Sequence, residues 1–464
     1  MARSALATSI KIATWLLAGF VLLIVIAAVA LAIFFDANDY KPEIIALVKE
    51  KTERDLAIPG DLAASVFPRP GVSFGALELS DAPGFGPAPF ARIERGEVQL
   101  KLLPLLKKQV RTDSVSLHGL TLNLSRNQSG RSNWDDLKPK QERGEPSSEA
   151  FSIGAIALTD ARVSFDDQSS GNHYVLDQLT INTDELSSDK DFDFELKSQV
   201  SSKQPQLIGQ IEANAVGNIN PAAERYRFQG KLFKAELLSG KDSVKIDLDG
   251  KLSAELRHAR YQLENLRATA ELAGEKIPEK LEVKLTARTR RMETGAATLE
   301  GFVLRGLGIT VEGNLQGNDS LTTGTLNVAE FNPRDVIQQL GMKPLQTTDP
   351  KVLNKASLGA ELKASPKALD LKKLIIKLDE STLTGNIAIE NFSKPAISFA
   401  LVIDKIDLDR YRIATTSAGS DTGTGELPLD RVRGQNIRGT LRVGELKVVD
   451  ERARDFLVTV DTRE

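Results

Sequence analysis

Few residues in this chain combine the types and the spacing that chemistry requires. The three histidines, His118, His173 and His258, lie far apart, and none has a second ligand at the i, i+4 spacing used by metal sites on helices. Asp135 and Asp136 could suggest an acid–base pair. However, adjacent residues on a strand face opposite ways, and in a turn they usually cap or are solvated. We therefore assign no catalytic role to these positions.

A second acidic group has a partial resemblance to a calcium loop. Asp404, Asp407 and Asp409 alternate along one segment, but the glycine and terminal glutamate of an EF-hand loop are absent. Lys405 and Arg410 can pair with these carboxylates on a solvated face. The chain also lacks cysteine, which excludes thiol nucleophiles, disulfides and cysteine-based zinc sites. The sequence predicts a protein that is not an enzyme, with no metal site and no cofactor.

The composition sets limits on size and partners. With 464 residues, the chain can form two or three ordinary domains or one long one. Its hydrophobic fraction of 41% and charged fraction of 27% are ordinary for a globular protein. A net charge of −3, without a basic stripe, gives no indication of nucleic-acid binding. The absence of cysteine is typical of a compartment in which thiols oxidise.

An uncharged apolar stretch covers residues 12–35. As a helix it would be about 36 Å long, enough for a hydrocarbon core of about 30 Å. Arg3 and Lys11 precede it, so we expect residues 1–11 to stay in the cytoplasm and the body to lie outside. Side chains expected to contact the membrane are Trp15, Phe20, Leu22, Ile24, Phe34 and Phe35.

The alternative for this stretch is a cleaved signal peptide, since Ala28-Val29-Ala30 is a small-residue site. The apolar run is much longer than the roughly 7–15 residues of a signal h-region. We therefore predict an uncleaved anchor and a single-pass inner (plasma) membrane protein. In a bacterium with two membranes, its body would lie in the periplasm.

The body alternates apolar and polar residues with period two, but the alternation slips. In SVSLHGLTLNLS (114–125) the slip falls at Gly119, and the same spacing returns with Asp160 at the slip. A slip of one residue would turn an apolar set to the opposite face, so a bulge or tight bend must restore the facing. The residues expected to face inward are Val115, Leu117, Leu120, Leu122, Leu124, Ile156, Leu158, Val163 and Phe165.

This five-position spacing also begins at Tyr174, Tyr261 and Leu369. Chance alone gives roughly five matches in a chain of this composition. Two interpretations therefore stay open, namely independent bent strands and a true repeat.

Short helices interrupt the predicted strands. Pro42 suits the first turn of a helix that follows the apolar stretch. Asn332 as cap and Gly341 as stop predict a helix over 333–340, and Asp349–Pro350 predicts another over 350–355. The charged segment 138–150 and the Gly/Ser/Thr-rich segment 416–430 are typical of linkers.

Several long segments resemble the AsmA family of bacterial envelope proteins. They begin with residues 35–106, which include the Phe67–Pro68 step and LeuLeuProLeuLeu (102–106). GRSNWDDL (130–137), FNPRDVIQQLGMKPLQTTDPKVLNKASLGAEL (331–362), LDESTLTGNIAI (378–389) and IDKIDLDRY (403–411) follow in the family's order. Family members usually continue into further strands after such a region, so the resemblance implies that 431–464 is the start of a truncated carboxy-terminal part.

The resemblance implies a mainly β fold: one transmembrane helix, then an elongated, curved antiparallel sheet forming a trough, with a few short helices. It also implies kinship with TamB and with chorein-type bridge-like lipid transfer proteins. The function implied is outer-membrane biogenesis by carrying phospholipid acyl chains. The alternative is a structural or regulatory role in outer-membrane protein assembly and protein targeting, with envelope proteins as partners. The expected regions are 1–11, 12–35, 36–137, 138–150, 151–415, 416–430 and 431–464.

Physical reasoning leaves two arrangements for such a sheet. Its apolar face must pack on another layer or hold something apolar. A closed sandwich and an open groove both satisfy that requirement. Because burial of each acyl methylene contributes about 0.8 kcal/mol, an open groove needs no sharp binding motif.

Overall fold

Strands dominate both units of the chain. The computed structural model describes residues 36–65, 69–101, 103–104, 111–137, 152–204, 206–275, 277–293, 296–318, 320–343, 345–412 and 436–462. The predicted anchor and the predicted linkers 138–150 and 416–430 lie outside these residues. No helix in the described ranges has the length and apolar composition needed to cross a bilayer. The chain divides into unit 1, up to Ala222, and unit 2, from Ala223; this division falls inside the predicted region 151–415.

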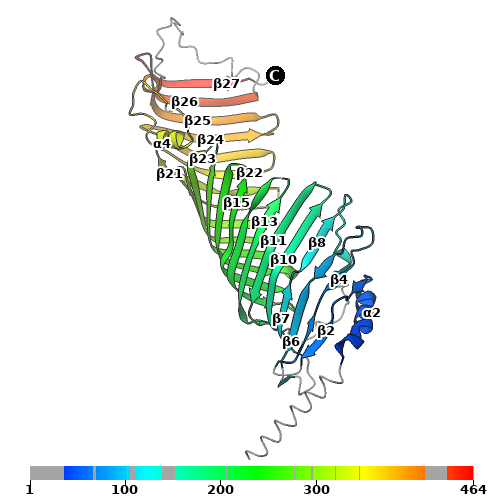
Figure 1. Ribbon diagram of the computed structural model, residues 1–464. Helices are drawn as coiled ribbons and strands as arrows, with labels where there is room; N and C mark the ends of the chain where they lie inside the picture. Colours follow the sequence, from blue (N-terminus) through cyan, green and yellow to red (C-terminus); the bar gives the residue numbers. More distant parts are fainter. Residues whose placement is uncertain are drawn as a thin grey trace, which may run out of the picture. The chain divides into compact units, whose positions relative to one another are not determined.

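Unit 1 begins with a short helical segment and continues as strands (Figure 1). Its helical elements are η1 (Ala37–Tyr40), α2 (Lys41–Thr52) and η2 (Asp135–Leu137). Its strands are β1 (Leu56–Ala57), β2 (Leu62–Ser65), β3 (Gly71–Phe74), β4 (Leu77–Leu79), β5 (Ala91–Ile93), β6 (Arg95–Leu100), β7 (Thr112–His118), β8 (Thr121–Arg126), β9 (Ser152–Ile153), β10 (Ala155–Asp167), β11 (Asn172–Thr183), β12 (Leu186–Ser187), β13 (Asp191–Ser202) and β14 (Leu207–Asn220). The helix predicted around Pro42 is α2, with that proline in its first turn.

The sheet of unit 1 is mostly antiparallel. The pairs β2–β3, β3–β6 and β6–β7 lead to β10, which pairs in parallel with both β7 and β8. β11, β13 and β14 then follow as antiparallel neighbours. β7 and β8 therefore act as two halves of one bent strand, and Gly119 lies at the bend.

The two slips in the sequence are neighbours in the structure. Gly119 has φ 66° and Asp160 has φ 52°, both in the left-handed region. The Gly119 amide donates to the Thr159 carbonyl at 3.1 Å. Gln178 on β11, with φ 50°, lies at a register shift on the next strand. The left-handed residue turns each strand, so the predicted bulge or bend is confirmed here, and Ala161 beside it is fully buried.

Replacing Gly119 with alanine should lower the free energy of unfolding by about 1–2 kcal/mol, because a side chain at positive φ strains the backbone. An added Cβ would also approach the Glu94 side chain to 2.5 Å, but that side chain is exposed and can move. Gly119→Asn should cost less, since asparagine tolerates this conformation. Urea unfolding followed by Trp134 fluorescence checks both variants; equal losses would mean that the contact with Glu94, and not the backbone, sets the cost.

Unit 2 is a sheet of long strands (Figure 1). Its strands are β15 (Arg225–Ser239), β16 (Asp242–Glu255), β17 (Arg260–Gly274), β18 (Ile277–Glu293), β19 (Ala296–Gly306), β20 (Ile309–Gly317), β21 (Thr322–Phe331), β22 (Ala356–Ala364), β23 (Ala368–Leu378), β24 (Ser381–Glu390), β25 (Ala396–Asp407), β26 (Asn436–Val448) and β27 (Glu451–Asp461). Its helical elements are η3 (Leu256–His258), α4 (Pro333–Gln339) and η4 (Leu408–Tyr411). Each strand pairs antiparallel with the next, except that β25 and β26 are parallel.

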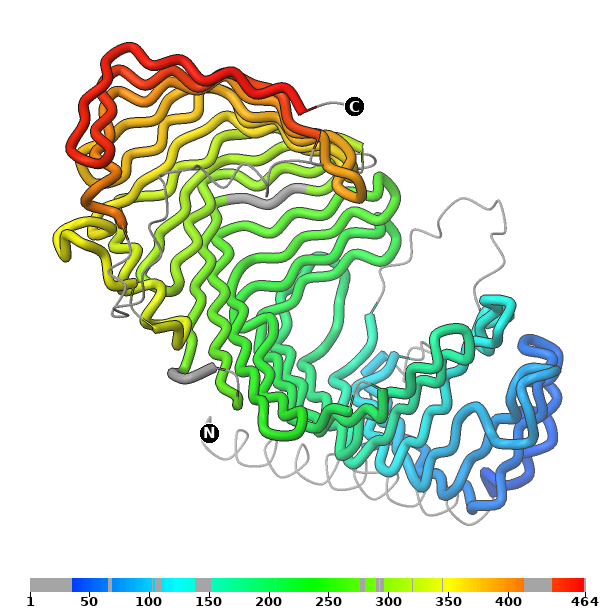
Figure 2. Tube along the Cα trace, turned by 90° about the horizontal axis from the view of Figure 1, so that it is seen from above, coloured from blue at the N-terminus to red at the C-terminus, as the bar shows by residue number. Residues whose placement is uncertain are grey.

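The strands of unit 2 bend partway along their length (Figure 2). Asn265, Gly301 and Lys373 are left-handed, with φ between 47° and 56°. The residue after each of them is buried, namely Leu266, Phe302 and Leu374. The five-position spacings that begin at Tyr174, Tyr261 and Leu369 are therefore produced by the same local geometry as the slip at Asp160, namely a left-handed residue within a strand. The left-handed amides also need acceptors: Gly301 donates to Asn314 Oδ1 at 2.7 Å, and Lys373 donates to Asn386 Oδ1 at 3.2 Å.

One of the two helices predicted in this unit is confirmed and one is wrong. α4 begins after Asn332, whose side chain accepts from the Arg334 amide. The segment 350–355 instead forms turns and bends. Leu353 is left-handed, with φ 60°, and the Asp379 carboxylate accepts from the amides of residues 353–355. Those amides donate to a side chain in the turn between β23 and β24, so a helix has no advantage there.

Candidate functional site: an apolar sheet face

In unit 1 the structure brings the predicted inward-facing residues together. Cross-strand partners lie on the same face of a sheet, and the predicted residues are partners of one another. The pairs are Val115 with Ile156, Leu117 with Leu158, Leu122 with Val163, and Leu124 with Phe165. Leu120 packs against the buried group of Leu158, Ala161 and Leu179. All nine residues therefore share one face.

The same face extends over the following strands. Leu158 is opposite Ile181 on β11, Ile181 is opposite Leu196 on β13, and Leu196 is opposite Ala213 on β14. Sequence reasoning did not assign β13 and β14 to this face. The alternation in β13 could have indicated it, because Phe192, Phe194 and Leu196 alternate there with charged residues.

The apolar face is the less exposed of the two, although no second layer covers it in the described residues. Along β13, Phe192 is buried and Phe194 and Leu196 are half-buried, whereas Asp193 and Glu195 are exposed. Of the nine predicted residues, Leu158 is buried and the other eight are half-buried. A sheet enclosed by a facing layer would bury most of these side chains, so their partial exposure favours an open face.

Unit 2 has an apolar face of the same kind, and it extends over more strands. One apolar residue from every strand between β15 and β27 joins a single row of cross-strand partners. The row consists of Phe233, Leu248, Ala268, Leu285, Leu304, Val311, Val328, Leu358, Ile376, Leu383, Ile403, Val443 and Phe456. At roughly 4.8 Å per strand, this apolar row extends over a distance on the order of 60 Å.

Most members of the apolar row are half-buried, which is the condition found in unit 1. Leu285, Val328 and Ile376 are half-buried, whereas Phe456 on the last strand is 44% exposed. A buried group of Leu266, Ala287 and Phe302 lies beside the row at the bend of the strands. The bend is thus filled by packed side chains, while the row remains partly accessible.

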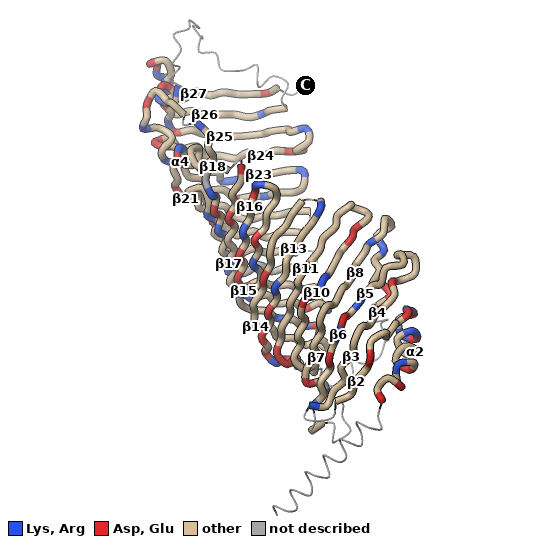
Figure 3. Tube along the Cα trace, viewed as in Figure 1, with Lys and Arg blue, Asp and Glu red and all other residues tan. Residues whose placement is uncertain are grey.

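Along β15, β16 and β17, charged residues lie mainly on the face opposite the apolar row and at the turns. Acidic and basic positions are interspersed along β15, β16 and β17 (Figure 3). They pair with one another across strands, as in Lys245–Glu236 at 3.3 Å and Lys251–Glu264 at 3.4 Å. Such exposed pairs contribute little to stability. Their effect is to keep this face of the sheet solvated, while the face that carries the row remains apolar.

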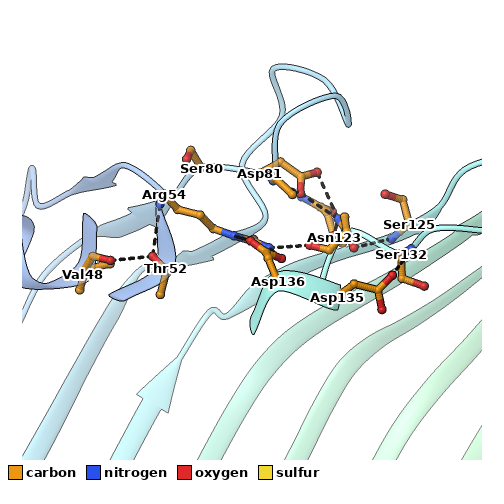
Figure 4. A network of polar contacts seen from close by, with 12 residues as sticks. Val48, Thr52, Arg54, Ser80, Asp81, Asn123, Ser125, Ser132, Asp135 and Asp136 are labelled. Carbon is orange, nitrogen blue, oxygen red and sulfur yellow. Dashed lines mark hydrogen bonds and ion pairs between the residues drawn. The ribbon is translucent and has the colours of Figure 1, made fainter. Parts of the chain in front are cut away.

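A buried polar network holds the beginning of unit 1 together (Figure 4). The Arg54 side chain is fully buried and contacts the Asp136 carboxylate, with Nη2–Oδ1 at 2.6 Å and Nε–Oδ2 at 3.0 Å. Nη2 also donates to the Asn133 carbonyl at 2.5 Å, and the guanidinium lies over the Phe90 ring at 4.4 Å. These hydrogen bonds hold the pKa of Asp136 below its ordinary value.

Asn133 links this network to the strands. It is fully buried; its amide nitrogen donates to Asp81 Oδ1 at 3.0 Å and to the Asn123 carbonyl at 2.8 Å. Its side-chain oxygen accepts from the Ser125 amide at 2.9 Å. The motif GRSNWDDL therefore has a structural role in this unit, since it ties the end of β8 to the segment after α2.

The other residues considered for catalysis or metal binding also make structural contacts. Asp135 accepts from the Ser132 amide at 2.8 Å, whereas Asp136 is bound by Arg54. His118 Nδ1 is 3.1 Å from the Thr159 hydroxyl. In the acidic segment 404–409, Asp407 caps η4, and Asp409 accepts from the Val449 amide at 2.7 Å. Among the described residues, no cluster of three metal-ligating side chains occurs.

The fold and this site define a class of protein with a mainly β fold, in which the sheet strands of each unit carry an apolar face that no second layer encloses in the described residues. The chain belongs to the AsmA family, whose sequence model matches residues 7–426. No curated protein and no solved structure matches the chain at a significant level. The family resemblance seen in the sequence is thus confirmed over most of the chain.

Proposed function

We propose that this protein is anchored in the inner membrane by residues 12–35 and carries phospholipid acyl chains along its apolar face in the periplasm. Its contribution to the cell would be outer-membrane biogenesis. Membership of the AsmA family and the large β sheet support this role. The observation that carries it is the unbroken apolar row of unit 2, which continues from strand to strand without a charged member.

The dimensions suit acyl chains better than a compact ligand. A bilayer core of about 30 Å contains two tails end to end, so a row on the order of 60 Å can hold several tails in sequence. Burial of methylenes is non-directional, which allows a tail to move along the row without breaking specific contacts. Lipid headgroups would remain in water beside the charged turns.

Lipid bound to the full-length chain tests the proposal. Leu122→Asp places a carboxylate on the apolar face of unit 1 and excludes several methylenes at about 0.8 kcal/mol each. We expect the phospholipid that copurifies with each chain, measured by mass spectrometry, to fall severalfold. The matched control is Ile208→Asp on β14, because Ile208 is 57% exposed and its strand partner is Ser201 on the opposite face.

Both variants keep the predicted anchor, so lipid attached to the anchor contributes equally to each. A folded Leu122→Asp protein, judged by circular dichroism, that carries as much lipid as the control would contradict the lipid role of this face. That outcome would favour the alternative function, a structural or regulatory factor in outer-membrane protein assembly and protein targeting.

A further inference from the structure

A second row of cross-strand partners crosses unit 2 on the same face as the apolar row. This second row begins at Phe228 on β15 and ends at Val460 on β27. Two of its members, Leu263 and Leu299, pack against the buried group at the bend of the strands. Leu285 of the apolar row packs against the same group. The two rows therefore flank the bend and share one face.

The second row contains one charged residue in the described strands. From β15 to β27 each member is apolar or glycine, except Arg290 on β18. The strand partners of Arg290 are Leu263 and Leu299, so its register position lies on the apolar face. Because the apolar row has no charged member, Arg290 is the exception along both rows.

The described parts of the neighbouring strands place no carboxylate next to Arg290 on that face. The closest acidic residues in the register are Glu264 and Glu300, which are the partners of Thr289. Adjacent strand residues face opposite ways, so both lie on the opposite face, where Glu264 contacts Lys251 at 3.4 Å. Covering an arginine with acyl chains is costly unless an anion accompanies it. A lipid bound over this position would therefore have to supply the negative charge itself.

A phospholipid meets this requirement in charge and in length. Its phosphodiester has one negative charge and oxygens that match the planar guanidinium of an arginine. Arg290 is three residues before Glu293, the end of β18, so a phosphate there would remain near the water at the turn. Five residues separate Arg290 from Leu285 in the apolar row, which is at most about 17 Å. A tail spans about 15 Å, half of a bilayer core, and so extends from Arg290 almost to that row.

We propose that Arg290 binds the phosphodiester of a phospholipid whose tails lie on the apolar face, and that it selects phospholipids over neutral lipids with the same tails. This inference rests on lipid binding in the proposed function and adds the class of lipid to it. Tail burial is non-directional and supplies affinity for any acyl lipid. The single cation among apolar positions supplies the discrimination.

A competition between two lipids tests this specificity. The full-length protein is exposed to vesicles with equal amounts of dioleoyl phosphatidylglycerol and dioleoylglycerol, which share their tails, and the lipid bound to the repurified chain is measured by mass spectrometry. We expect the ratio of bound phospholipid to bound diacylglycerol to fall about tenfold in Arg290→Leu. It should fall less in Arg290→Lys, which keeps the charge without the planar fork.

The matched control is Arg291→Leu, which removes the next arginine along β18. Arg291 is the partner of Gln262 and Thr298, and its position is on the opposite face. The control should keep the ratio of the unmodified chain. If Arg290→Leu does not fold, as judged by circular dichroism, Arg290→Gln takes its place, because it removes the charge but keeps a polar side chain.

The outcomes distinguish this inference from the proposed function. Equal ratios in folded Arg290→Leu and Arg291→Leu, with lipid still bound to both, would overturn the role of Arg290 and leave lipid binding intact. Binding of neither lipid to the unmodified chain would contradict the proposed function, and this inference with it. Excess inorganic phosphate should leave the ratio of the unmodified chain nearly unchanged. A fall to the ratio of Arg290→Leu would assign Arg290 to free phosphate and overturn its role in lipid binding.

Discussion

Replacing Asp136 with alanine should lower the free energy of unfolding of unit 1 by about 3–5 kcal/mol, because it leaves the buried Arg54 cation without its carboxylate. The opposite deletion should cost less. In Arg54→Ala the remaining carboxylate has a side chain that is 30% exposed, so water can solvate it. This asymmetry distinguishes a desolvated cation from a simple loss of contacts.

The measurement can be confined to unit 1. The chain has two tryptophans, and Trp134 lies between Asn133 and the Asp135–Asp136 pair, 6.1 Å from the Phe165 ring. In a Trp15→Phe background, urea unfolding followed by tryptophan fluorescence reports on this network alone. The control is Lys49→Ala, which removes an exposed pair with Asp55 and should cost about 0–1 kcal/mol.

A double variant and a pH series complete the test. Arg54→Met with Asp136→Leu should recover much of the loss, because an apolar pair has no charge to desolvate. The pKa of Asp136 is lowered in the folded state, so its stabilising contribution is present above the ordinary carboxylate value, about 3.9, and disappears as the pH falls through the lowered value. Asp136→Asn should flatten this part of the pH dependence. Equal losses for Asp136→Ala and Lys49→Ala would refute the structural role of the network.

The local geometry of the strands could be predicted from sequence. The slips at Gly119 and Asp160 required a residue able to bend the strand, and both residues adopt left-handed conformations. Alternation also placed the residues predicted to face inward on one face of the sheet, as the pair Leu117–Leu158 shows. Both predictions rest on the period of two, which is a property of neighbouring residues.

Features that depend on distant residues could not be predicted in the same way. The Arg54–Asp136 contact joins positions 82 residues apart, and no pattern near either residue indicates it. The wrong helix at 350–355 has the same origin, since the amides there donate to Asp379, which lies in the turn after β23. Predicting the apolar row of unit 2 would require the register of each strand pair. That register depends on the position of every bulge.

The apolar row offers a second test with a large expected effect, because two adjacent isoleucines on β23 lie on opposite faces. Ile376 is a member of the row, with Leu358 and Leu383 as its partners. Ile375 is 46% exposed on the other side. The variants Ile376→Asp and Ile375→Asp therefore introduce the same carboxylate into the same strand and differ in the face that carries it.

If tails move along the row, Ile376→Asp should slow phospholipid transfer about 100-fold. A tail that passes the carboxylate loses the burial of three or four methylenes, which is about 3 kcal/mol at about 0.8 kcal/mol each, and each 1.4 kcal/mol changes a rate about tenfold. Transfer of fluorescent phospholipid from vesicles containing the full-length protein to acceptor vesicles measures this rate. Ile375→Asp should transfer at the rate of the unmodified chain.

The lipid content of the two variants adds a separate constraint on mechanism. A single obstacle on β23 leaves the remaining strands of the row free, so Ile376→Asp should keep most of its bound lipid while it loses transfer. Loss of lipid and transfer in equal proportion would indicate a carrier that holds its tails near β23 and does not pass them along. Transfer by folded Ile376→Asp at the rate of Ile375→Asp would mean that tails do not follow the row, because no path along it avoids the strand that joins β22 to β24.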